Sequence, residues 1–211
     1  MSGIVGVCGL EDKNLLKRMG DVVFHRGPDG FKIFSDRKIG LGHRHLIIKN
    51  PEEKKQPAHN EDESIWAVLD GQIYNYPELK RDLENRGHKL RSSCNAEVIL
   101  HMYEEYGDFF VRKLNGMFAI AIWDRSNKKL LLARDRIGIK PLHYTVLGDV
   151  LLFGSEIKSV LQYEEVPHRV NLQSLFNFLN FNYIPGKETM LEGIRRLRAG
   201  AYSYIQKRGD N

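Results

Sequence analysis

The chain has 211 residues, of which 42% are hydrophobic, enough to bury one substantial core. Its formal net charge is +5, but the basic residues are scattered and lack the stripe with interleaved aromatic residues that nucleic-acid binding favours. No apolar run approaches the roughly 20 residues of a membrane span, and no spacing among the two cysteines and eight histidines is typical of a metal site.

The first half of the chain is predicted to contain both strands and helices. Apolar and β-branched runs indicate strands over residues 3–8, 31–34, 39–46 and 64–69. Apolar residues at helical spacing predict helices over 13–24, 77–87 and 95–106. The segment 25–30 is dense in turn residues, and the polar segment 50–63 is interpreted as a surface loop.

The second half is richer in strands. Strands are predicted over residues 117–123, 129–133, 142–147, 150–153 and 201–206, with short helices over 157–162 and 172–179. Two groups of strands with helices on both sides favour an α+β layered sandwich. No flexible linker divides the chain, so residues 1–211 are interpreted as a single domain.

The N-terminus carries a motif with catalytic potential. Because Ser2 is small, an aminopeptidase is expected to remove Met1 and to leave Ser2 with a free α-amine at the head of the first strand. A hydroxyl or thiol beside its own α-amine is one known way to make a nucleophile and its base from one residue. A Met-Ser start is common, however, and the rest of the chain must decide its meaning.

Several segments together resemble the N-terminal glutaminase domain of asparagine synthetases, within the class II glutamine amidotransferase family. The matching segments run in family order: 3–6 (GIVG), 25–30 (HRGPDG), 70–75 (DGQIYN), 96–106, 114–124, 134–142 (RDRIGIKPL) and 154–158 (GSEIK). The segments 134–142 and 155–158 point to the asparagine synthetase branch. The resemblance implies a four-layer αββα sandwich of the N-terminal-nucleophile hydrolase type, which agrees with the predicted elements.

The resemblance also implies a mechanism. In the family, an N-terminal cysteine attacks the side-chain amide of glutamine, ammonia leaves for a second active site, and water hydrolyses the thioester. Ser2 stands at the nucleophile position, and a serine hydroxyl does not ionise near neutral pH as a thiol does. Asp70 and Gly71 stand at the oxyanion-hole positions, where the family has an asparagine and a glycine. An ionised aspartate offers only acceptors.

The positions that bind substrate in the family also differ here. Arg26 matches the loop over the nucleophile, whereas His45 replaces the arginine that binds the glutamine carboxylate. Asn95 replaces the aspartate that binds the ammonium group, and Gln72 replaces a glutamate. Arg44 is adjacent to His45, but a strand neighbour points to the opposite face unless the register slips.

These departures favour a glutaminase-type domain that is catalytically degenerate. Two alternatives remain open: an active glutaminase with Ser2 as nucleophile, or a non-catalytic module that binds another small ligand or regulates a partner. Each departure also has a structural explanation. Asn95 is a good N-cap for a helix over 96–106, Asp70-Gly71 is ordinary turn chemistry, and a histidine at 43 or 45 suits a core.

The expected partner is a synthetase domain or subunit, together with glutamine if the site is active. The pyrophosphate loop of the Ser-Gly-Gly-x-Asp-Ser type is absent from residues 1–211, so ATP and Mg²⁺ are assigned to that partner and no cofactor or metal is expected here. A homodimer remains open, whereas nucleic acid and membrane are not expected partners. Two cysteines without a preceding secretory segment favour the reducing cytoplasm.

Overall fold

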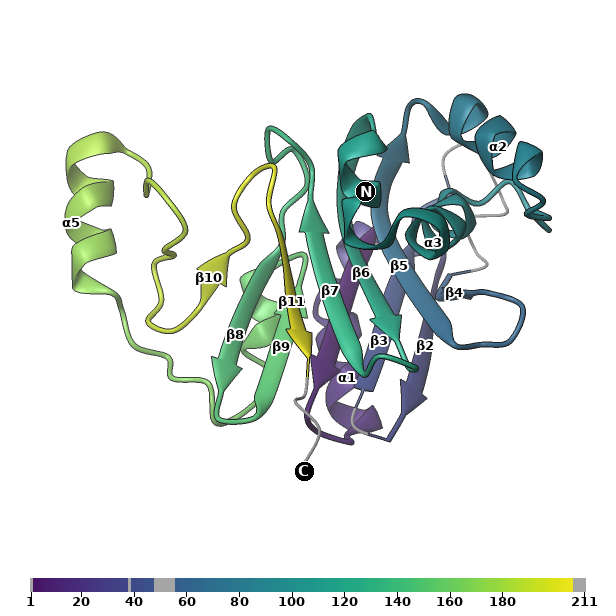
Figure 1. The fold of residues 1–211 in the computed structure, drawn as a ribbon. Helices are drawn as coiled ribbons and strands as arrows, with labels where there is room; N and C mark the ends of the chain where they lie inside the picture. Colours follow the sequence, from purple (N-terminus) through teal and green to yellow (C-terminus); the bar gives the residue numbers. More distant parts are fainter. Residues whose placement is uncertain (1, 38, 48–55, 207–211) are drawn as a thin grey trace.

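The first of two antiparallel sheets contains the N-terminal strand at its centre (Figure 1). The computed structural model describes residues 2–37, 39–47 and 56–206. The sheet has the order β10-β8-β9-β1-β3-β2. Its strands are β1 (Gly3–Cys8), β2 (Gly30–Asp36), β3 (Ile39–His45), β8 (His143–Leu147), β9 (Val150–Gly154) and β10 (Arg195–Arg196). Central placement of β1 brings the residue before it close to both neighbouring strands.

The second sheet packs against the first and has the order β11-β7-β6-β5-β4. Its strands are β4 (Ala58–His59), β5 (Ile65–Ile73), β6 (Gly116–Asp124), β7 (Lys129–Arg134) and β11 (Tyr202–Gln206). The central pair β5 and β6 is in register over nine residues, from Ile65 opposite Asp124 to Ile73 opposite Gly116.

Helices cover the outer face of each sheet, which gives the predicted four-layer αββα sandwich. The helices α1 (Lys13–Asp21) and α4 (Ile157–Val160) pack on the first sheet, and α2 (Tyr76–Asn85) and α3 (Asn95–Tyr106) pack on the second. Two 3₁₀ helices, η1 (Phe24–Arg26) and η3 (Gly107–Lys113), continue from α1 and α3. Within the described ranges, no helix combines the length and apolar character needed to cross a bilayer.

Three apolar layers hold the sandwich together, and strand alternation sets them up. Along β5, Val68 points between the sheets, whereas Leu69 points outward into the layer beneath α2 and α3. Leu41 and Phe153 of the first sheet meet Val68 in the layer between the sheets. The same alternation directs Asp70, two residues after Val68, toward the first sheet. The sequence pattern therefore places a charged side chain in an apolar layer.

The structure differs from the predicted elements at a few places. The helix predicted over 13–24 ends at Asp21. Val22 is its C-cap, and Val23 precedes the 3₁₀ helix η1, so the apolar pattern extends beyond the α-helix. The described part of the loop predicted over 50–63 contains the short strand β4. The strand β10 was not predicted, since two consecutive arginines lack strand composition. It forms by pairing with β8.

Candidate active site

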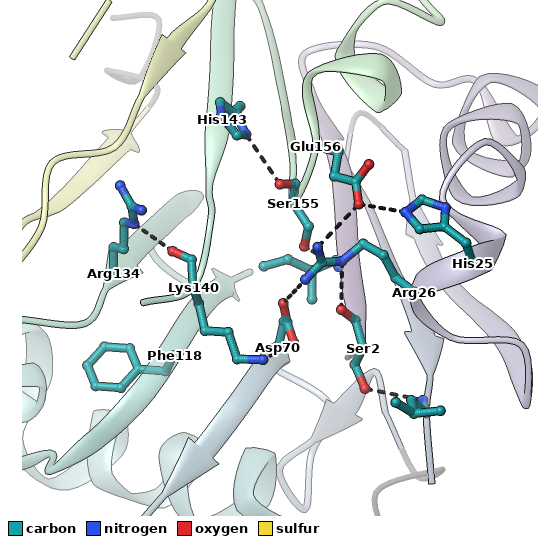
Figure 2. A network of polar contacts seen from close by, with 12 residues as sticks. Ser2, His25, Arg26, Asp70, Phe118, Arg134, Lys140, His143, Ser155 and Glu156 are labelled. Carbon is teal, nitrogen blue, oxygen red and sulfur yellow. Dashed lines mark hydrogen bonds and ion pairs between the residues drawn. The ribbon is translucent and has the colours of Figure 1, made fainter. Parts of the chain in front are cut away.

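Ser2 lies immediately before β1 and is held by two hydrogen bonds (Figure 2). Its Oγ accepts a hydrogen bond of 3.3 Å from the Leu46 amide, directly after β3. Its carbonyl oxygen accepts one of 2.9 Å from Arg26 Nε. The predicted removal of Met1 concerns a residue outside the described ranges. The head of β1 therefore presents the Ser2 hydroxyl to the end of β3.

Arg26 is the centre of the polar network around Ser2. It lies in η1 and is only 6% exposed. Besides Ser2, its guanidinium binds Asp70 (Nη2 to Oδ2, 2.8 Å) and Glu156 (Nη1 to Oε1, 3.2 Å). The turn after Arg26 requires Gly27, since a Cβ there would lie 2.6 Å from a backbone carbon of β3. This close approach brings the Arg26 side chain over Ser2.

Asp70 is fully buried, and each of its carboxylate oxygens faces a cation. Oδ2 lies 2.8 Å from Arg26 Nη2, and Oδ1 lies 3.0 Å from Lys140 Nζ. Both cationic side chains are themselves buried. A buried charge is tolerated only when it is paired and hydrogen-bonded, and this carboxylate meets both conditions. The three side chains therefore form a buried ion-pair cluster between the sheets.

Lys140 is positioned by the loop that follows β7. The Arg134 guanidinium donates to the carbonyl oxygens of Gly138 (2.7 Å) and Lys140 (2.6 Å). The Asp135 carboxylate accepts from the amides of Ile139 (2.8 Å) and Lys140 (2.9 Å). Both side chains therefore bind the backbone of this loop and so aim Lys140 at the interior.

Glu156 closes the network on its exposed side. It accepts hydrogen bonds from His25 (2.8 Å) and Arg26 (3.2 Å) and lies 3.2 Å from Lys158 Nζ. Burial raises the pKa of Glu156, but the hydrogen bonds from these three partners outweigh it and the pKa is lowered. Sequence reasoning missed Glu156 and Lys140, although both lie in segments that carry the family resemblance.

The glycine after Asp70 is required by the sheet itself. Gly71 has a φ of +148°, and a Cβ there would lie 2.0 Å from the Met117 carbonyl oxygen of β6. Gln72 follows with an exposed side chain. The interpretation of Asp70-Gly71 as turn chemistry is wrong, because both residues lie inside β5. The close contact of β5 with β6 explains the glycine instead.

Asn95 is the first residue of α3, and its side chain accepts a hydrogen bond of 3.2 Å from the Ile73 amide of β5. The interpretation of Asn95 as the N-cap is wrong, because Cys94 occupies the cap position. The start of α3 lies against β5, so the amide reaches the strand rather than its own helix. Asn95 thereby fixes the end of the strand that carries Asp70.

His45 and His43 form a buried pair on the inner face of β3. Their Nδ1 atoms lie 2.6 Å apart, and burial together with the nearby His45 lowers the pKa of His43 well below its usual value. Arg44 points to the opposite face, where it donates to the Gly20 carbonyl (2.8 Å) and stacks on the Phe31 ring. This packing against α1 excludes the register slip that would place Arg44 in the site.

Comparison with known proteins identifies the family. The model of the glutamine amidotransferase domain matches residues 1–211. The chain belongs to this family. Among curated proteins, the chain is similar to asparagine synthetase [glutamine-hydrolyzing] 1 of Bacillus subtilis (35% identical over the whole chain and 34% of that protein). It is also similar to asparagine synthetase [glutamine-hydrolyzing] 2 of the same organism (44% identical over 81% of the chain and 24% of that protein).

Solved structures agree with this amidotransferase fold. The structure titled as the allosteric regulatory enzyme of purine biosynthesis matches with a TM-score of 0.66 at 21% identity, over 76% of this chain and 43% of that one. Glutamine phosphoribosylpyrophosphate amidotransferase of B. subtilis matches with a TM-score of 0.64 at 19% identity, over 93% of this chain and 49% of that one. These neighbours confirm the predicted fold class. The chain spans about a third or less of its curated relatives.

Replacing Asp70 with asparagine tests the ion-pair cluster in this amidotransferase domain. Asp70→Asn leaves Lys140 buried beside a neutral amide, so we expect the free energy of unfolding to fall by about 3 kcal/mol. Urea unfolding measures the change, with Asp149→Asn at an exposed turn as the matched control. Equal effects of the two substitutions would contradict a stabilising role for the Asp70 ion pairs.

His143 gives the domain a defined pH dependence. Burial lowers its pKa to about 4, although its contact with the Ser155 carbonyl (3.3 Å) opposes the shift. An unfolded histidine has a pKa near 6.5, so the unfolded chain binds a proton first and stability falls as pH drops from about 6.5 to 4. We expect His143→Gln to remove on the order of 2 kcal/mol of that loss. Urea unfolding at pH 7 and 4.5 measures the loss of unfolding free energy, and His168→Gln, at an exposed histidine, is the control. If His143→Gln lost as much stability between these pH values as His168→Gln does, His143 would not be the source of the pH dependence.

Proposed function

We propose that this chain is the glutaminase-type domain of an asparagine synthetase-like amidotransferase, and that its glutamine-hydrolysing site is catalytically degenerate. Membership of the glutamine amidotransferase family and 35% identity to an asparagine synthetase over the whole chain support the first part. The polar network at the family's catalytic positions supports the second.

The observation that carries the proposal is the pair of contacts that the Asp70 carboxylate makes with Arg26 and Lys140. In glutamine hydrolysis, negative charge develops on the substrate oxygen, and an oxyanion hole must offer N–H donors to it. Asp70 stands at the donor position as a carboxylate that accepts from Arg26 and Lys140. Loss of one such donor typically slows a reaction by about 10²–10³, and a carboxylate adds repulsion. The two cations beside Asp70 offset part of that repulsion, but their N–H groups point at the Asp70 oxygens, so they do not replace the missing donor.

The two positions expected to bind the glutamine zwitterion support the same conclusion. His45 is paired with His43 in the interior, and the lowered pKa of His43 keeps that partner neutral. Asn95 carries no charge, and its side-chain oxygen binds the Ile73 amide. Asn95 therefore supplies no counter-charge for an ammonium group, and His45 lacks the bidentate guanidinium with which an arginine binds a carboxylate. Substrate binding and transition-state stabilisation are therefore both impaired.

The alternative that Ser2 acts as an active nucleophile is supported by one feature, the placement of its hydroxyl at the head of β1. A free α-amine with a pKa near 8 would serve as the base. This alternative needs a functional oxyanion hole beside Ser2. The Asp70 ion pairs weigh against it.

Glutamine-dependent ammonia release separates these alternatives. We expect no turnover from the Met1-processed protein and none from Ser2→Cys alone, because the oxyanion and substrate positions stay altered. The combined variant Ser2→Cys, His45→Arg, Asp70→Asn and Asn95→Asp is expected to release ammonia at a rate at least about 10² above the upper limit measured for Ser2→Cys. Circular dichroism confirms that each variant is folded. Recovery by Ser2→Cys alone would show that the pocket is intact.

We further propose that the partner is a synthetase domain, which would bind ATP and Mg²⁺. The two curated relatives described above are about three to four times as long as the stretch they share with this chain. The helix α5 (Leu172–Phe181) supports a docking role, since it projects from the sandwich (Figure 1) and exposes a row of large apolar side chains. Leu172 is 74% and Leu179 is 72% exposed. Apolar surface of this kind marks protein contacts.

Hydrogen exchange tests this partner assignment. We expect the α5 amides to gain protection of about tenfold or more when residues 1–211 are joined to a synthetase domain of the asparagine synthetase type, because docking excludes water. Phe176→Asp should abolish that protection. Lys187→Asp, at another exposed position, is the matched surface control. Light scattering tests the alternative that α5 mediates a homodimer. If residues 1–211 formed a dimer that Phe176→Asp dissociates, α5 would be a self-association surface, and the proposal would be overturned.

A further inference from the structure

A cluster of metal-ligand side chains lies on the outer side of α3, built from residues that the polar network around Ser2 does not use. His101 and Glu104 are one helical turn apart on α3, and His88 follows α2 in the chain. His101 Nδ1 lies 2.6 Å and His88 Nδ1 lies 3.8 Å from Glu104 Oε2. One ligand atom from each residue falls within 4.8 Å of the other two.

The distances suit a single small cation. Zn²⁺ binds histidine nitrogen and carboxylate oxygen at about 2.0–2.2 Å, which places neighbouring ligand atoms of a tetrahedral site roughly 3.3 Å apart. The contacts of Glu104 Oε2 with the two histidines, at 2.6 and 3.8 Å, lie on either side of that value. Small side-chain rotations therefore suffice to open the short contact and to close the long one.

A second set of contacts orients the ligands. His88 directs its other nitrogen, Nε2, toward Glu105 Oε2 at 3.4 Å, an arrangement that leaves Nδ1 to face Glu104. Asn60 Nδ2 donates to Glu104 Oε1 at 2.9 Å and so leaves Oε2 for the histidines. Metal-binding histidines in proteins typically donate their second ring nitrogen to a carboxylate in this way. The orientation is therefore present without a metal.

The cluster is also built into a rigid part of the fold. His101 is only 2% exposed, on a twelve-residue helix that packs against β5. His101 Nδ1 lies 2.6 Å from Glu104 Oε2, and Asn60 Nδ2 donates to Glu104 Oε1 at 2.9 Å, so both oxygens of this carboxylate are held in place beside His101. A bound metal would take the place of the hydrogen bond between His101 and Glu104.

We propose that His88, His101 and Glu104 bind a transition-metal ion of the Zn²⁺ type and thereby tie the α2–α3 connection to α3. Two imidazole nitrogens and one carboxylate oxygen are a ligand set that zinc sites use, with water completing the tetrahedron. The sequence predicted no metal because it contains no typical Cys/His spacing. The site is formed by folding, which brings His88 beside a helix that starts seven residues later.

Isothermal titration calorimetry of residues 1–211 with ZnCl₂ alone tests the proposal. We expect one Zn²⁺ per chain, with no comparable binding of MgCl₂, because Mg²⁺ prefers octahedral oxygen ligands. His88→Gln and Glu104→Gln should each weaken the 1:1 binding at least about 100-fold. Glu105→Gln, which removes the carboxylate that orients His88 and its ion pair with Arg86, should weaken it about tenfold. His168→Gln removes an exposed histidine outside the cluster and should leave the binding unchanged.

Cobalt absorption gives an independent readout. With Co²⁺ in place of Zn²⁺, the wild-type chain should show the visible absorption of a tetrahedral nitrogen and oxygen site, and His88→Gln should lose it. Because His88 lies on the surface side of the cluster, its variant tests the site without removing the buried His101. Zinc affinity of His88→Gln and Glu104→Gln equal to wild type, or no 1:1 binding by wild type below millimolar Zn²⁺, would overturn the proposal.

Discussion

The buried carboxylate of Asp70, paired with Arg26 and Lys140, is the interaction on which the polar interior depends. Charges in an apolar layer are tolerated only in pairs, so each of these side chains fixes the others. Arg26 comes from the turn after α1, Asp70 from β5 of the opposite sheet, and Lys140 from the loop after β7. The cluster therefore joins segments from both sheets at the position of Ser2 (Figure 2).

The fold and the chemistry of this domain are separable. Leu41 and Phe153 build the apolar layer between the sheets and come from β3 and β9, whereas the ion-pair cluster comes from η1, β5 and the loop after β7. Gly71 stays necessary for the contact of β5 with β6 whether or not its amide serves an oxyanion. Strand and helix packing can thus keep an amidotransferase fold while the charged positions change. The contacts of Asp70, His45 and Asn95 likewise hold the fold together and do not depend on catalysis.

The sequence was sufficient for the fold class and for most elements, because periodicity is a local property. The helix Asn95–Tyr106 and the strand Gly3–Cys8 were predicted with their observed bounds. The family segments placed Ser2 at the head of the first strand, whereas the interpretation of Asp70 as turn chemistry missed that β5 continues through it. The pairing of Asp70 with Lys140 was not predictable, since no local pattern links residues 70 positions apart. The contact of Asn95 with Ile73 and the grouping of His88 with His101 were missed for the same reason.

The most direct test of the central claim is the binding of glutamine itself, since binding precedes any chemistry. Backbone amide NMR of the Met1-processed chain, titrated with glutamine to 10 mM or so, reports on contacts at Gly3 (the first amide after Ser2), Leu46 and Gly71 without requiring turnover. We predict no saturable shift of these amides, because the pocket lacks both the carboxylate-binding arginine and the ammonium-binding aspartate of the family, and its cations are bound to Asp70. Saturable shifts at those three residues with a Kd below about 1 mM, equivalent to roughly 4 kcal/mol of binding free energy, would contradict the account.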